Sequence, residues 1–472
     1  MSTINAGTAR VDITPTYPIA LGGFGQRTTD SVGTHDPLFG KAIYLSDGRE
    51  HLLWITTDLL SIPGQLTAGV LEGITQKTGL ESRQICLCAS HTHSGPAIRG
   101  WHLVETDSIR RYMGALLAAL IDVGVRAVAY GQASRLRVAS GKVDFQINRR
   151  TRGHPNIVDD RLFALSVEDP DTGSSKAVLF GVGCHPVCVG YENYLMCADY
   201  PGYAQRYIES QFPTANALFF NMAQGNMIPS TRKPTNSMDP RGYDGASFDS
   251  ADTIGGRLAH AVLEALRDAP AAETLDLLSS RGTCQVRQNH YDLTPEKALK
   301  KVEERRRVIA QYLGEDYFAG VTPENLSPLK SIWSDACRLV VEENMDDDRM
   351  IPLLSSICQY RVYLNRALNP APVPLDVPVQ VMGINEYLFL ALPGEVLIEV
   401  AFDWKQRTNS DRSYIVALAN DAYGYLPHST NFEEPNAEVK YETIMNALEP
   451  QAMDLAVQKG CQMVAAAGGR SC

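Results

Sequence analysis

Two histidines follow a short apolar segment near residue 90. The segment ICLCA at 85–89 predicts a buried strand, which ends at a polar turn closed by Gly95 and Pro96. Because His91 and His93 are two residues apart, their side chains point to the same side of an extended backbone. They could share a metal ion, or one could bind the metal while the other transfers a proton. Two polar residues in a surface loop are the alternative, but their place after a buried strand favours a functional site.

Further polar side chains also follow apolar segments. His185 comes after VLFGVGC, Glu395 after YLFLALPG, and Tyr425 shortly after YIVALAN. Each has a structural alternative, namely a core histidine, a helix cap and a packed aromatic ring. Asp58, at the end of HLLWITTD, is either a helix cap or part of the same site. Open α/β sheets gather ligand groups at strand ends, and two histidines with one carboxylate are a known catalytic zinc set.

Two other groups of residues could also bind a ligand. The pairs Cys86/Cys88 and Cys184/Cys188 have spacings that a thiolate zinc site could use, but alternate cysteines in apolar strands are usually small core residues. The glycine-rich segment LGGFGQR at 21–27 resembles a phosphate-binding loop only in composition. Its spacing fits neither a Walker loop nor a dinucleotide fingerprint, so a nucleotide site is not predicted there.

The composition is that of an ordinary globular protein. The 472 residues are 44% hydrophobic and 21% charged, with a net charge of -11. This charge argues against a nucleic-acid partner and against binding to an anionic membrane surface. No secretory signal opens the chain, no apolar run approaches the ~20 residues of a membrane span, and ten cysteines are too sparse for a disulfide scaffold. We therefore expect a cytoplasmic protein that acts on a small molecule. The sequence leaves open whether the protein forms a homo-oligomer.

The order of the predicted elements indicates a single domain over residues 1–472. Strands alternate with helices, which predicts an α/β fold of layered mixed β-sheets flanked by helices. A hairpin is expected around Asp47 and Gly48, and another around the Ser-Gly pair in RLRVASGKVDFQIN. Strands are expected again beyond residue 355, including QYRVYLNRAL at 359–368. Helices are predicted at 63–80, 105–129, 251–268, 295–313, 327–343 and 442–459, and those within 290–350 form a helical insertion or lid.

Four segments, in their order along the chain, resemble the catalytic domain of the neutral/alkaline (non-lysosomal) ceramidase family. They are SHTHSGP, GCHPVC, LALPGE and NDAYGY, and the opening segments ARVDITP and GTHDPLFGKAIYL are also similar to the family. The resemblance implies a zinc amidase of mixed α/β fold. It further implies that His93 lies beside the metal and that Tyr441, in KYET, stabilises an oxyanion. The metal ligands that it implies are His91, His185, Glu395 and Tyr425.

One segment departs from the family pattern. The family has a catalytic serine in a GDxSPN element, whereas this chain has GNMIP, with Ile228 at the serine position and Asn226 at the acidic one. An isoleucine side chain can neither attack a carbonyl nor donate a hydrogen bond to it. Ser230 lies two positions later, beyond a proline, and the printed sequence ends without the family's C-terminal immunoglobulin-like domain. These departures predict a reaction other than ceramide hydrolysis.

The sequence thus predicts a zinc-dependent hydrolase that cleaves an amide or ester of a small polar substrate with a metal-activated water. His93 would act as general base and then general acid, and Tyr441 would donate to the developing oxyanion. Arg149, in INRRTRG, would bind an anionic group or form a surface salt bridge. The alternatives are a zinc-dependent lyase, isomerase or glycosidase on the same scaffold, and a non-catalytic metal-containing binding protein.

Overall fold

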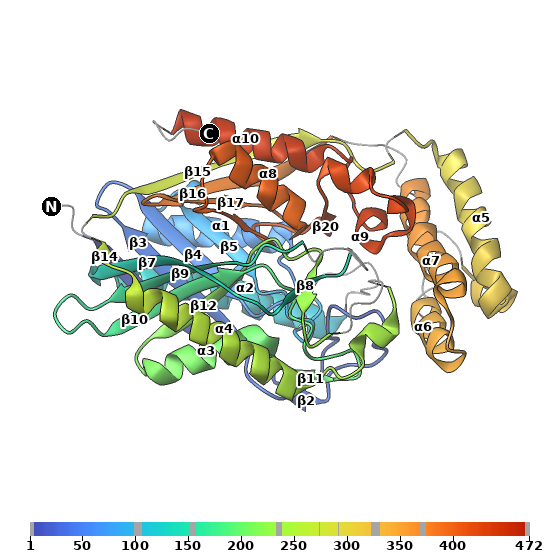
Figure 1. Ribbon diagram of the computed structural model, residues 1–472, viewed down its shortest axis with the longest axis horizontal. Helices are drawn as coiled ribbons and strands as arrows, with labels where there is room; N and C mark the ends of the chain where they lie inside the picture. Colours follow the sequence, from blue (N-terminus) through green and yellow to red (C-terminus); the bar gives the residue numbers. More distant parts are fainter. Residues whose placement is uncertain are drawn as a thin grey trace.

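Three central β-sheets with helices on their outer faces make up the body of the molecule (Figure 1). The sheets contain both parallel and antiparallel strand pairs. This architecture confirms the predicted α/β class of layered mixed sheets flanked by helices. The computed structural model describes residues 4–98, 106–150, 157–232, 238–272, 274–290, 292–321, 331–368 and 374–467.

The first sheet lies under two N-terminal helices. Its members are β1 (Asn5–Asp12), β3 (Phe39–Ser46), β4 (His51–Thr57), β5 (Ile85–Ala89) and β6 (Gln132–Ala133), covered by α1 (Gly64–Thr78) and α2 (Asp107–Ala129). The strand order is β5-β4-β3-β1-β6. β3 and β4 form the predicted hairpin around Asp47 and Gly48, and β5 pairs parallel with β4. Asp58 does not cap α1, since its carboxylate accepts from the N–H of Phe39 and from Gln205.

The second sheet is covered by α3 and α4. Its members are β7 (Arg135–Lys142), β9 (Arg161–Glu168), β10 (Ser175–Val182), β12 (Asn216–Asn221) and β14 (Ala271–Ala272), with α3 (Asp199–Gln211) and α4 (Phe248–Asp268) outside. The order is β12-β10-β9-β7-β14. The predicted turn at Ser140 and Gly141 is wrong, because β7 runs straight through both residues. Gly141 faces Leu162 and Ala265, so a residue without a side chain fits beneath α4.

The third sheet comes from the C-terminal part of the chain and lies under α8 and α10. Its members, in the order β15-β16-β17-β19, are β15 (Leu277–Val286), β16 (Leu375–Ile384), β17 (Tyr387–Ala391) and β19 (Ser413–Val416), with α8 (Ile398–Thr408) and α10 (Ala452–Ala466) outside. The helix predicted over 442–459 is instead a short α9 (Tyr441–Ile444) followed by α10. Pro450 lies between them, and proline cannot donate a helical hydrogen bond.

Three small ladders complete the sheets. They are β2 (Gly33–Thr34) with β11 (Leu195–Met196), β8 (Gln146–Asn148) with β13 (Met227–Pro229), and β18 (Glu395–Val396) with β20 (Tyr425–Leu426). The inner faces of the three large sheets share one apolar cluster. Trp54 of the first sheet packs there with Phe220 of the second and Phe389 of the third, at centroid distances of 4.8 and 5.3 Å. This shared core fixes the relative positions of the strand ends.

A group of helices projects from one side of the sheets (Figure 1). It consists of α5 (Pro295–Leu313), α6 (Ile332–Glu342) and α7 (Asp347–Leu368), which share their own apolar core. The strand predicted at 359–368 is wrong, because this segment is the end of α7. Tyr360, Tyr363 and Leu364 are buried at helical spacing against that core. The predicted boundary at residue 350 thus falls inside α7.

α2 is long and apolar enough, by length and composition alone, to cross a membrane. It also packs on the first sheet, burying seven residues at helical spacing, namely Ile109, Tyr112, Leu116, Leu120, Val123, Gly124 and Ala127. Charged side chains, including Asp122 and Arg126, lie on its remaining surface. This pattern is typical of a core helix.

Candidate metal centre

The chain turns sharply after β5. His91 has a φ of 74°, in the left-handed region that costs a residue with a side chain about 1–2 kcal/mol. Its N–H donates to the carbonyl of Leu59 at 2.9 Å, and its Nδ1 lies 2.7 Å from the carbonyl oxygen of Leu60. The expectation that His91 and His93 project from an extended backbone is therefore wrong. The turn nevertheless brings the two rings together.

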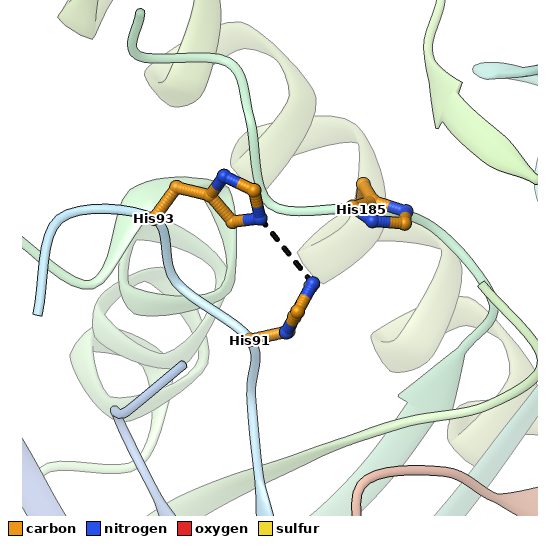
Figure 2. A group of neighbouring side chains, drawn as sticks. All are labelled: His91, His93 and His185. Carbon is orange, nitrogen blue, oxygen red and sulfur yellow. Dashed lines mark hydrogen bonds between the residues drawn. The ribbon is translucent and has the colours of Figure 1, made fainter. Parts of the chain in front are cut away.

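His93 lies beside His91, with their Nε2 atoms 3.3 Å apart (Figure 2). The ring of Phe24 packs edge-on against His93 at a centroid distance of 4.7 Å. The Nδ1 of His93 is buried and has no hydrogen-bond partner among the described residues. Gly23, at a φ of 91°, leaves room for the imidazole, because a Cβ there would lie 2.4–2.6 Å from its atoms.

His185 reaches the same place from the end of β10. Its Nδ1 lies 2.7 Å from the carbonyl oxygen of Gln224 and 3.2 Å from that of Met227. Carbonyls accept only from a protonated Nδ1, so Nε2 is left unprotonated in the neutral ring. That Nε2 lies 3.1 Å from Oε2 of Glu395. Histidines that ligate metals are commonly oriented by such a backbone carbonyl.

Glu395 joins the two imidazoles. Its Oε2 lies 3.3 Å from Nε2 of His91 as well as 3.1 Å from Nε2 of His185. Burial alone would raise the pKa of this carboxyl group, but the two histidines hold it well below its usual value. Burial lowers the pKa of His185 to about 4 and that of His93 well below its usual value. Neutral imidazoles beside a carboxylate are the protonation states that a metal ion requires.

The three imidazoles lie close enough together to hold a metal ion. Their ligand nitrogens are within 4.8 Å of one another, the one such group of histidine, cysteine or acidic side chains among the described residues (Figure 2). The unprotonated Nε2 atoms of His91 and His185, with the Glu395 carboxylate, form a mixed nitrogen and oxygen donor set. Such a set fits zinc and other divalent transition metals.

Tyr425 and Arg149 lie on one side of this group. Tyr425 is paired with Glu395 in the parallel β18–β20 ladder. Nη2 of Arg149 donates to the Tyr425 hydroxyl at 3.0 Å and to the carbonyl of Gly225 at 2.8 Å, and its Nε donates to Glu442 at 2.8 Å. The alternative of a surface salt bridge is wrong, since both members of the Arg149–Glu442 pair are buried. The guanidinium orients the phenol.

Tyr441 begins α9 and packs against Tyr425, with ring centroids 5.4 Å apart and the rings nearly perpendicular. Burial raises the pKa of the Tyr441 phenol, so it stays a hydrogen-bond donor at neutral pH. The ring of Trp333, in α6, also lies near Tyr441, with the centroids 6.5 Å apart. The structure therefore brings together all seven of the side chains that the sequence selected.

The position of the family's serine lies in an apolar wall. Ile228 is buried in β13 and packs with Phe24 and Val187. Asn226 is also buried, where its Nδ2 donates to Glu399 and its Oδ1 accepts from the N–H of Ile398 at the start of α8. Both side chains are thus committed to packing and to helix capping. Ser230, beyond β13, is exposed.

The four cysteines of the alternative thiolate site lie in apolar cores. Cys86 and Cys88 belong to the core between the sheets, whereas Cys184 and Cys188 belong to the core beneath α3 and α4. Burial raises the pKa of all four thiols, to about 12 for Cys88. A metal ligand must be a thiolate, so these residues are better described as small core residues.

The sequence prediction missed the residues that hold His93. Arg27 donates to the carbonyls of His93 and Gly22, to Ser94 and to the carbonyl of Gly190. These contacts anchor the turn that follows His91. The glycine-rich segment LGGFGQR was the available signal, because it contributes Gly23, Phe24 and Arg27 together. Its glycines provide close approach to His93 rather than to a phosphate.

Known proteins share this fold. Neutral ceramidase from Pseudomonas aeruginosa superposes with a TM-score of 0.71 at 17% identity, covering 100% of this chain and 76% of that chain. A ceramidase structure described as complexed with C2 gives 0.70 at 17% identity, with 100% and 77% coverage. At these identities the likeness establishes the fold alone.

Sequence comparison identifies the family. Neutral ceramidase B of Dictyostelium discoideum is 21% identical, covering 97% of this chain and 71% of its own length. Neutral ceramidase of Pseudomonas aeruginosa is 24% identical over 68% of this chain, which spans half the length of that relative. The model of the family "Neutral/alkaline non-lysosomal ceramidase, N-terminal" matches residues 4–420. The chain therefore belongs to the neutral/alkaline non-lysosomal ceramidase family, a family of hydrolases.

Proposed function

We propose that the protein is a zinc-dependent hydrolase that cleaves an amide or ester bond in a small polar substrate. The observation that carries the proposal is the meeting of His91 and His185 with one oxygen of Glu395, at 3.3 and 3.1 Å. Membership of a family of metal-dependent hydrolases supports the reaction class. His91, His185, Glu395 and Tyr425 would hold the ion.

Zinc, when bound, supplies a Lewis acid for the substrate carbonyl and lowers the pKa of water toward ~7. The chain supplies the groups around it. His93 is buried and neutral, so its unprotonated ring nitrogen could accept a proton from the attacking water and then give it to the leaving group. Tyr441 would donate to the developing oxyanion, a contribution worth about 3 kcal/mol in other enzymes. Ile228 excludes a seryl intermediate at this position.

The insertion supports a small substrate. Trp333 of α6 packs so closely on the backbone of Gly25 that a Cβ there would lie 2.9 Å from its ring. The same indole lies against Tyr441. Trp333 thus lies against both the glycine-rich segment and Tyr441, and we expect its ring to disfavour substrates with long acyl chains.

Metal analysis tests the proposal first. Protein purified without chelator should contain about one zinc per chain, and His185→Ala should lose it, because Nε2 of His185 would be removed. His260→Ala, on the exposed face of α4, is the matched control and should keep the ion. Native protein with an intact fold and no stoichiometric metal would contradict the mechanism.

Solvent labelling distinguishes the reaction classes. A hydrolase incorporates one oxygen from heavy-oxygen water into the acid that it releases from an amide or ester. The products of a lyase or isomerase that does not add water would carry no such label. Short-chain amides and esters are the substrates to screen. Turnover without label would replace the hydrolase by the lyase or isomerase alternative on the same metal.

A further inference from the structure

Arg232 is a buried cation that forms no ion pair with any residue that the structure describes. It lies just after β13 and is 5% exposed. Its Nε and Nη1 atoms are buried and have no hydrogen-bond partner among the residues that the structure describes. By contrast, the buried Arg149 pairs with Glu442, and the partly buried Arg150 and Arg161 pair with Glu442 and Asp159. A buried unpaired charge destabilises a fold by several kcal/mol, so its presence needs an explanation.

The guanidinium of Arg232 stacks on an aromatic ring that leads to the candidate site. Its carbon lies 3.5 Å from the ring centroid of Tyr243. Tyr243 in turn packs edge-on against Phe24 at 4.9 Å, and Phe24 packs edge-on against His93 at 4.7 Å. Two aromatic rings thus connect Arg232 to the imidazole that would transfer protons. The same rings pack with Ile228, four residues before Arg232.

A second buried arginine lies close to the candidate site. Arg27 also lacks a carboxylate partner in the described part of the chain, since its side chain donates to backbone carbonyls and to Ser94. The acidic side chains that act on Arg232 are Asp199 and Asp244, and the Asp199 carboxylate already accepts from the backbone N–H groups of Cys188, Val189 and Tyr200. Burial lowers the pKa of Arg232 although Asp199 and Asp244 oppose the shift, so part of the cost of burying its charge is not offset. An anion entering this site would relieve that cost.

We propose that Arg232 binds a carboxylate group of the substrate, so that the enzyme selects amides or esters that carry a carboxylate near the scissile bond. A guanidinium presents its donors in a planar fork that matches a carboxylate. The apolar wall of Phe24, Val187 and Ile228 would contact the uncharged part of the same molecule. This inference rests on the proposed hydrolase function for its substrate, but the anion site can be tested separately.

Binding of benzoate, measured by calorimetry, tests the anion site without turnover. Arg232→Gln should weaken benzoate binding about 10- to 100-fold, the effect of losing a charged hydrogen-bonding partner. Arg412→Gln is the matched control, because Arg412 also stacks on a tyrosine, Tyr387, at 5.4 Å, but pairs with Glu386 at an exposed position. Equal benzoate affinities in the wild type and in Arg232→Gln would overturn the proposal.

Specificity tests the substrate class. N-Benzoylglycine and N-propylbenzamide have the same amide and similar size, but only the former carries a carboxylate. The wild type should favour N-benzoylglycine in kcat/KM, and this ratio should fall about 10- to 100-fold in Arg232→Gln. Hydrolysis of both compounds with an unchanged ratio would overturn the carboxylate assignment and leave the hydrolase standing. Arg232-dependent benzoate binding without zinc or hydrolysis would instead overturn the proposed function.

Stability separates this role from a structural one. If Arg232 only stacked on Tyr243, Arg232→Gln would lower the unfolding temperature and leave the substrate ratio unchanged, and that result would contradict the proposal. A ligand-binding arginine predicts an equal or higher unfolding temperature, because the buried charge is gone. Arg232→Lys keeps the charge and should restore part of the benzoate affinity.

Discussion

Backbone carbonyls, rather than other side chains, orient the imidazoles of the candidate metal centre. Leu60 holds Nδ1 of His91, while Gln224 and Met227 hold Nδ1 of His185. Because these carbonyls are main-chain groups, no substitution of a single side chain removes them. The two Nε2 atoms are thus directed toward Glu395 before any ligand arrives.

Gly23→Ala should impair catalysis through His93. The new Cβ would overlap the imidazole, and φ of 91° strains any residue with a side chain. We expect a loss of about 2–4 kcal/mol in unfolding free energy and a fall in activity. Gly48→Ala is the control, with a φ of 85° and open space around it, and should show only the backbone cost of about 1 kcal/mol with normal activity. Equal losses of stability would show that the ring can move aside.

The sequence predicted which residues meet, but not how they are held. Residue type and position after apolar segments were sufficient to select His91, His185 and Glu395. The left-handed turn at His91 depends on hydrogen bonds to Leu59 and Leu60, and no local pattern marks it. No sequence pattern marked Arg232 as a binding residue. It stands out only in the structure, where two of its buried nitrogens have no hydrogen-bond partner among the described residues.

Asp58 should make stability depend on pH in a recognisable direction. Burial raises the pKa of its carboxyl from 3.8 to about 6. The folded state therefore binds the proton more tightly, and this stabilisation is full below about pH 4 and lost as the pH rises through 6. The free energy of unfolding of Asp58→Asn, measured with urea, should consequently rise relative to that of the wild type by up to about 3 kcal/mol between pH 4 and pH 7. A pH-independent difference would contradict the raised pKa.

At the scale of elements, periodicity decided which predictions succeeded. α5 was predicted at its observed bounds, because its charged sequence opens with Pro295 after a capping Thr294. The end of α7 was predicted as a strand, since tyrosine, valine and leucine alternate in QYRVYLNRAL. Packing against α5 and α6 selected the helical face instead, and this long-range contact is invisible in a local window.

α6 should control the length of the acyl group. Trp333→Ala would open the space between Gly25 and Tyr441, so kcat/KM for octanoyl amides should rise about tenfold relative to acetyl amides. Val341→Ala, exposed on the same helix, is the control and should leave the ratio unchanged. An unaltered chain-length profile in Trp333→Ala would contradict the role of the insertion as a lid.

At the scale of the whole molecule, the α/β class followed from the alternation of strands and helices. The order of the strands within each sheet could not be predicted in this way. It depends on packing between the sheets, where Trp54, Phe220 and Phe389 share one core. Pairings across such distances in sequence depend on global packing. They also bring together strand ends that a sequence can only suggest are neighbours.

Removal of the metal should lower the stability of the entire fold. An ion that binds only the folded state at 100 times its Kd contributes about 2.7 kcal/mol. Dialysis against a chelator should therefore lower the unfolding temperature, and added zinc should restore it. His185→Ala should show no such response. A chelator effect that is identical in this variant would place the ion elsewhere.

The centre draws its groups from three sheets, with His91 beyond β5, His185 beyond β10 and Glu395 beyond β17. No fragment that contains only one sheet has the complete donor set. A break in the exposed turn between β9 and β10 would leave His91 on one piece and His185 on the other. Binding of the ion by two such pieces would then show that they have reassembled into the complete fold. The site could therefore serve as the readout of a split-protein complementation assay.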